Sequence, residues 1–195
     1  MIKMGFYSTP INVNLQGYLG LYRESFAVDY MENNNRLHKL INSFFEKTRD
    51  GQTVNYSEEN KKNIVELYLS LKRENWEGSL LCFSDNEQVE ISDFKLLGYD
   101  VCSDSMYYSP LGDGFLMQYN RYPEFYTDMS FEMYCMYKDN INHAWLFNSY
   151  ETAMNFSQYC NHINKKKLHC IESGENWRPF AIYLYNTDDD SLSDD

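Results

Sequence analysis

The sequence predicts a mixed α+β fold, because segments with helical periodicity flank a central region of short apolar runs. We expect N-terminal helices packed with a mixed or antiparallel sheet, followed by a C-terminal helix and a closing strand. The regular strand and helix alternation of a doubly wound protein is missing. Hydrophobic residues make up 43% of the 195 residues, which suffices for one core. One domain over residues 1–186 is therefore expected, with an acidic, disordered tail over 187–195.

Two helices are predicted in the first half of the chain. The first covers residues 34–50, where apolar side chains recur at helical spacing and Gly51 follows as a stop signal. The second begins at Ser57, a favourable N-cap with two glutamates in the first turn, and ends near Trp76. The expected inward residues are Leu37, Leu40, Ile41, Phe44 and Phe45 in the first helix, and Ile64, Leu67, Tyr68 and Leu71 in the second.

The centre of the chain predicts strands, because short apolar runs are separated by turn-forming Asp, Asn, Ser, Gly and Pro. These runs cover residues 80–83, 94–97, 115–117 and 131–137. A third helix is expected to open at Asn148 or Ser149, with Glu151 in the capping-box position relative to Asn148 and with Ala153, Phe156, Cys160 and Ile163 on one face. The alternating residues 180–185 predict the closing strand.

The charge balance favours a basic protein as the partner. The formal net charge is -12, from 17 Lys and Arg against 29 Asp and Glu, and the chain also carries 18 Tyr, 12 Phe and 3 Trp. Acidic proteins repel phosphate backbones, so direct nucleic-acid binding is not expected, whereas rings beside carboxylates suit a basic protein surface. No signal sequence or membrane span is evident, and the five cysteines do not form a close-set disulfide framework. We therefore expect a cytoplasmic protein without membrane contact.

The sequence offers few candidates for a metal or phosphate site. Cys160, His162, His169 and Cys170 are close together, but Cys160 and His162 are two residues apart on a predicted helix and point in different directions. We expect a buried Cys160, exposed histidines and no metal. The segment 112–114, Gly-Asp-Gly, lacks the remaining residues of a phosphate loop and predicts a hairpin turn. Neither a cofactor nor a small-molecule ligand is expected.

An enzymatic interpretation stays open as an alternative. Asp100, Asp104 and Asp113 lie near one another in the sequence, as the carboxylates of a magnesium-dependent nuclease would, although their spacing matches no calcium loop. His143 stands between apolar neighbours, a context more typical of a core or interface residue than of a general base. A metal-dependent hydrolase would use Asp100, Asp104 and His143. An adaptor protein of a phage or mobile element is a further alternative.

Two segments of the C-terminal half resemble a known family. The stretch LLGYDVCSD at 96–104, followed by YSPL at 108–111, resembles a segment of bacterial immunity proteins from polymorphic and contact-dependent growth-inhibition toxin systems. The stretch LFNSYETA at 146–153, continuing to Phe156, and RPFAIYL at 178–184 resemble the helix and closing strand of the same proteins. The resemblance covers residues 94–186.

This resemblance implies a cytoplasmic, non-enzymatic protein that binds its cognate toxin domain and neutralises it. Many such toxins are nucleases with a basic groove for phosphates, and an acidic inhibitor can occupy that groove. The candidate contact residues are the aromatic and acidic side chains of the central loops. They are Asp104, Tyr107, Tyr108, Asp113, Tyr119, Tyr122, Glu124, Tyr126 and Asp128.

Overall fold

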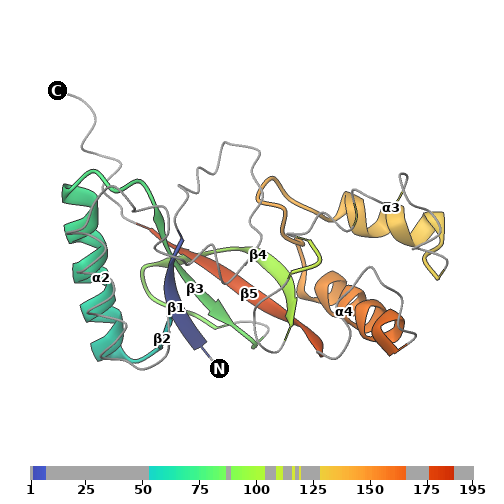
Figure 1. Cartoon of the computed structure of the whole chain (residues 1–195), viewed down its shortest axis with the longest axis horizontal. Helices are drawn as coiled ribbons and strands as arrows, with labels where there is room; N and C mark the ends of the chain where they lie inside the picture. Colours follow the sequence, from blue (N-terminus) through green and yellow to red (C-terminus); the bar gives the residue numbers. More distant parts are fainter. Residues whose placement is uncertain are drawn as a thin grey trace. The chain divides into compact units, whose positions relative to one another are not determined.

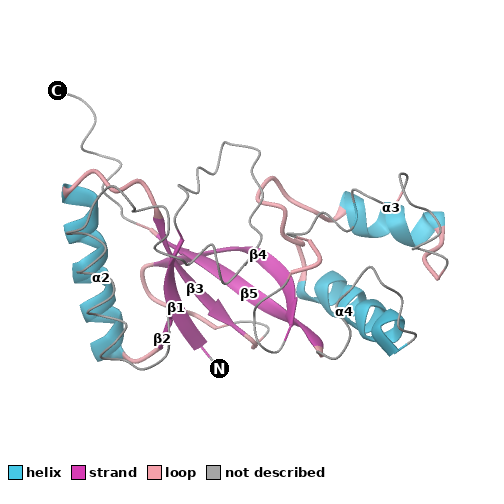
Figure 2. Cartoon of the chain, in the orientation of Figure 1, coloured by secondary structure: helices cyan, strands magenta, loops and turns pink. Residues whose placement is uncertain are grey.

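The computed structural model confirms the α+β class. It describes residues 2–7, 53–86, 89–103, 109–111, 116, 119, 128–165 and 176–186. Within these residues five strands form one sheet in the order β2-β1-β3-β5-β4, and three helices lie outside it, as the colours of Figure 2 show. The helix predicted over 34–50 and the tail at 187–195 lie outside the described residues. Of the strand predicted at 115–117, only Leu116 is described, and it is buried.

The chain divides into two compact units. The first contains the described residues up to Leu97 and those from Ile182 onward, and the second contains Gly98 to Ala181. Strands β4 (Phe94–Ser103) and β5 (Trp177–Tyr185) each continue along the chain from one unit into the other. The single domain expected over 1–186 stays a prediction.

The first unit is built on β1 (Ile2–Tyr7), which pairs antiparallel with both β2 (Thr53–Asn55) and β3 (Ser79–Ser84). Neither β1 nor β2 was predicted from the sequence. Met4 of β1 lies opposite Val54 and Cys82, and all three side chains are buried. Helix α2 (Glu58–Arg73) lies beside these strands in Figure 1 and packs with Ile64, Leu67, Tyr68 and Leu71 turned inward, as predicted.

Local signals account for both ends of α2. The Ser57 side chain accepts a hydrogen bond from the Asn60 amide, which confirms the predicted N-cap. The helix ends at Arg73, three residues before Trp76, because Asn75 adopts a left-handed conformation with φ of 61°. The Trp76 amide then donates to the Leu71 carbonyl and the Asn75 amide to the Lys72 carbonyl, which closes the last turn in a Schellman motif.

The second unit contains α3 (Phe131–Asp139) and α4 (Tyr150–Lys165), which pack through the rings of Tyr137 and Phe156, with centroids 4.9 Å apart. The strand predicted at 131–137 is wrong. Ser130 accepts a hydrogen bond from the Met133 amide, and Tyr134 and Tyr137 are buried three residues apart, which is helical spacing. Because almost every residue of this run is apolar, the sequence did not reveal its period.

The start of α4 settles the choice between Asn148 and Ser149. The Ser149 hydroxyl accepts from the Thr152 amide, and the Ser149 carbonyl accepts from the Ala153 amide, so Ser149 caps the helix. The Asn148 amide instead donates to the Asn140 carbonyl. The predicted inward face is confirmed, because Ala153, Phe156, Cys160 and Ile163 are buried. The predicted strands at 80–83, 94–97 and 180–185 correspond to β3, β4 and β5, all three longer than expected.

Candidate protein-binding surface at helix α3

Two of the predicted contact residues lie at the start of α3. The Tyr119 ring stacks on Tyr134, with centroids 4.2 Å apart and planes 10° from parallel, and its hydroxyl donates to the Met129 carbonyl at 3.2 Å. Asp128 is the residue immediately before Met129, and its carboxylate lies 3.7 Å from the His162 ring nitrogen Nε2. The structure therefore brings both residues to the segment that enters α3.

The remaining seven predicted contact residues lie outside the described residues. They are Asp104, Tyr107, Tyr108, Asp113, Tyr122, Glu124 and Tyr126. The expectation that they bind a partner stays a prediction, and so does the hairpin turn predicted at 112–114.

An exposed aromatic side chain that the sequence alone does not mark lies beside Tyr134, the residue on which Tyr119 stacks. Phe131, the first residue of α3, leaves 66% of its surface accessible to solvent, and Met136 leaves 41%. The Phe131 ring lies 6.1 Å from that of Tyr134, so it extends the stacked tyrosine pair outward. The sequence alone does not mark Phe131, because the apolar run 131–137 favours a strand. In a helix that starts after Ser130, position 131 falls outside the buried stripe.

Many of the tyrosines are used in the two cores rather than on the surface. In the first unit the Tyr68 ring of α2 contacts the rings of Trp76 and Tyr185 edge to face. In the second unit Tyr137 packs against Phe147, Phe156 and Tyr159. The buried tyrosines of the described residues are Tyr68, Tyr99, Tyr134, Tyr137, Tyr159 and Tyr183. The aromatic content therefore overstates the surface available for binding.

Asp100, a candidate for metal chemistry, is fully buried in a structural network. Its carboxyl oxygen Oδ1 accepts hydrogen bonds from the Val101 amide at 2.8 Å and from the Ser109 hydroxyl at 2.6 Å. The Cys102 sulfur lies 3.5 Å from Oδ2. Burial, together with the charge of Asp100, raises the pKa of the Cys102 thiol well above its ordinary value. This arrangement ties Ser109 to β4 and leaves the carboxyl group inaccessible to solvent.

The histidine and cysteine candidates do not form a site in the part of the chain that the structure describes. His143 is exposed, so it is not a core residue, and its alternative interpretation as an interface residue stays a prediction. Cys160 is buried and His162 exposed, as expected, while His169 and Cys170 lie outside the described residues. The described residues contain no group of three or more His, Cys, Asp or Glu side chains placed to hold a metal ion.

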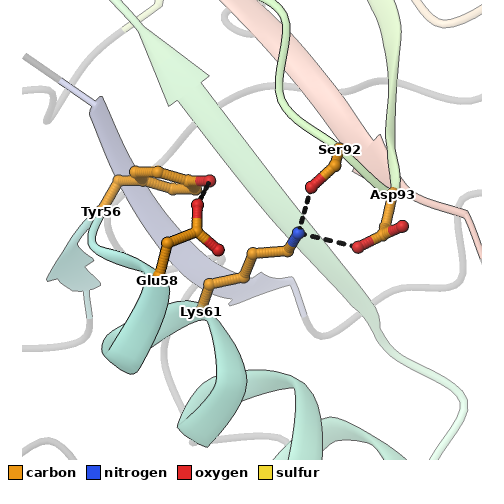
Figure 3. A network of polar contacts seen from close by, with 5 residues as sticks. All are labelled: Tyr56, Glu58, Lys61, Ser92 and Asp93. Carbon is orange, nitrogen blue, oxygen red and sulfur yellow. Dashed lines mark hydrogen bonds and ion pairs between the residues drawn. The ribbon is translucent and has the colours of Figure 1, made fainter.

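One further polar network lies in the first unit, at the base of α2. Figure 3 shows the buried Lys61 ammonium between the Ser92 hydroxyl at 2.5 Å and the Asp93 carboxylate at 2.7 Å. Next to it, the Tyr56 hydroxyl donates to Glu58 at 2.7 Å, and this bond, together with burial and the nearby negative charge, raises the pKa of Tyr56 to about 12. Asp93 has a φ of 67°, so the ion pair fastens a tight turn to α2. We interpret this network as structural.

Comparisons with known proteins do not identify the chain. Neither a protein-family model, nor a curated protein, nor a solved structure matches it. Across the described residues, no helix has both the length and the apolar character needed to span a membrane.

Proposed function

We propose that this chain is an immunity-type protein, which acts in the cytoplasm by binding a cognate toxin domain and covering its active site. The observation that carries the proposal is the exposed Phe131 beside carboxylates, on a chain with a net charge of -12. A large ring among acidic side chains suits a basic protein surface, which charge attracts and an apolar anchor retains. A basic nuclease domain is the partner class that this chemistry fits best.

A second line of support is the contact between the segments that carry the family resemblance. The Tyr99 amide donates to the Phe147 carbonyl at 2.9 Å, and the Phe147 amide donates to the Tyr99 carbonyl at 2.8 Å. Tyr99 and Phe147 thus belong to one local structure, so the joint resemblance of the two segments to immunity proteins concerns residues that pack together. The alternative hydrolase gains no comparable support, because Asp100 is buried and hydrogen-bonded.

The test is protection of cells against the toxin domain encoded next to this chain. We expect co-expression to restore growth, and we expect the purified proteins to form a complex whose association rate falls as salt rises. An unrelated basic nuclease is the control, because mere attraction between opposite charges would give binding to both. Equal killing with and without this chain, or equal binding to both nucleases, would contradict the proposal.

A further inference from the structure

The outward face of α3 combines apolar and acidic side chains in two adjacent stripes. Residues four and seven apart lie on one side of a helix. Phe131, Cys135 and Lys138 therefore form one stripe, and Glu132, Met136 and Asp139 form the next. Every one of these side chains is exposed except that of Cys135, which is half-buried. Tyr134 and Tyr137 occupy the opposite, buried side.

The stability of α3 does not explain why its outward face carries Phe131. Phenylalanine is a weaker helix former than alanine or glutamate, and its mostly exposed ring gains little from burial. Single exposed apolar residues are common on protein surfaces. Here, however, Phe131 and Met136 lie on either side of the acidic positions 132 and 139, and Phe131 continues the stacked Tyr119–Tyr134 pair.

Charge decides what kind of partner this face fits. The carboxylates of Glu132 and Asp139 outnumber the single ammonium of Lys138, which lies 5.7 Å from the centre of the Tyr134 ring. Both this face and the chain as a whole therefore repel nucleic acid and anionic lipid surfaces. A protein surface rich in Arg and Lys, with an apolar pocket for a ring, is complementary in both respects.

We propose that the outward face of α3 is the surface with which this chain docks onto its basic protein partner. Phe131 is the anchor that enters an apolar pocket, and Glu132 and Asp139 meet the partner's Arg or Lys side chains. This inference rests on the proposed function and specifies which face performs it. The anchor sets the dissociation rate, because a buried ring dominates the binding energy, and the carboxylates set the association rate.

The anchor is tested with Phe131→Ala, using the toxin domain encoded beside this chain as the probe. We expect the dissociation constant to rise about 30-fold or more, mainly through faster dissociation. Leu96→Ala is the matched control, because Leu96 is an exposed apolar residue of the first unit, with 36% of its surface accessible. We expect it to change the dissociation constant less than about twofold. Phe131→Leu, which keeps an apolar side chain, should raise the dissociation constant less than Phe131→Ala does.

The carboxylates are tested with the double variant Glu132→Gln/Asp139→Asn. At low salt we expect association to slow several-fold, and the difference from the wild type should shrink as salt rises. Glu59→Gln/Glu66→Gln is the matched control, since these exposed glutamates are also seven residues apart on a helix, α2. Both double variants change the net charge by the same amount. Slower association of the α3 variant alone therefore shows that the position of the carboxylates matters, and not only the total charge.

A further test leaves every residue of the outward face of α3 unchanged and measures how fast the Cys135 thiol is alkylated. Three of the five cysteines, Cys82, Cys102 and Cys160, are fully buried. With Cys170 replaced by serine (Cys170→Ser), Cys135 is the thiol that remains for alkylation. We expect complex formation to slow its alkylation at least several-fold. If the wild type neither binds the toxin domain nor protects cells, the proposed function fails. If it does both, but Phe131→Ala behaves like Leu96→Ala and Cys135 is not protected, the function stands and this surface is wrong.

Discussion

Gly98 is a residue at which the backbone of β4 admits no side chain. Its φ is 151°, a value that L residues rarely adopt, and a Cβ atom there would lie 2.8 Å from the Leu146 Cβ and the Phe147 carbonyl oxygen. The absence of a side chain lets the Tyr99 and Phe147 backbones hydrogen-bond next to it. Gly98 thus permits the contact between β4 and the segment around Phe147.

We expect Gly98→Ala to lower the free energy of unfolding by about 2–4 kcal/mol, since backbone strain and a steric clash add. Urea denaturation of the two proteins measures the difference. Lys95→Ala, an exposed substitution in the same strand, should stay within about 0.5 kcal/mol of the wild type. If Gly98→Ala were as stable as Lys95→Ala, the segment around Leu146 and Phe147 would have moved to accommodate the methyl group without loss of stability.

Individual residues also show what sequence reasoning could and could not supply. Ser57 was a predictable cap, and Ser149 was one of two candidates beside Asn148, because a cap acts on amides three residues away in its own chain segment. The burial of Asp100 was not predictable, since its partner Ser109 lies nine residues further on and no local pattern marks the pair. The exposure of His143 between apolar neighbours was missed for the same reason: tertiary packing determines it.

At the scale of elements, predictions succeeded where one period dominated and failed where none did. The stripe of α2 has polar residues between its apolar ones, whereas the run Phe131–Tyr137 has only Glu132 as a polar position. Strand β1 carried an alternating signal in Ile2, Met4 and Phe6 that could have been found. Its partner β2 has three residues, and only pairing with β1 defines it.

The N-cap of α3 gives a testable consequence at this scale. Ser130→Ala should destabilise the protein by about 1 kcal/mol, because the Met133 amide loses its acceptor. Hydrogen exchange at Met133 should then accelerate. Ser57→Ala removes the equivalent cap of α2 and should cost a similar amount without changing exchange at Met133. Unchanged exchange at Met133 in Ser130→Ala would contradict the role assigned to this serine.

At the scale of the whole molecule, ionisable groups in the core link stability to alkaline pH. Burial raises the pKa of the Cys82 thiol from 9.0 to about 12, and burial likewise raises that of the Tyr137 hydroxyl from 10.0 to about 12. The pKa of Cys102 is raised in the same direction. Below pH 9 both the folded and the unfolded chain keep these protons, so the full stability is present.

Between pH 9 and 12 the unfolded chain releases protons that the folded chain retains, so stability falls as pH rises. Cys82 and Cys102 each contribute a slope that approaches about 1.4 kcal/mol per pH unit above pH 9, and Tyr137 adds to the decline from pH 10. Urea denaturation at several pH values measures the slope. Cys82→Ala should make the fall of the free energy of unfolding between pH 9 and 10 less steep by the contribution of one thiol. This holds even if the variant is less stable than the wild type at pH 7. A wild-type stability that stays constant from pH 8.5 to 10 would show that these thiols do not remain protonated in the folded protein.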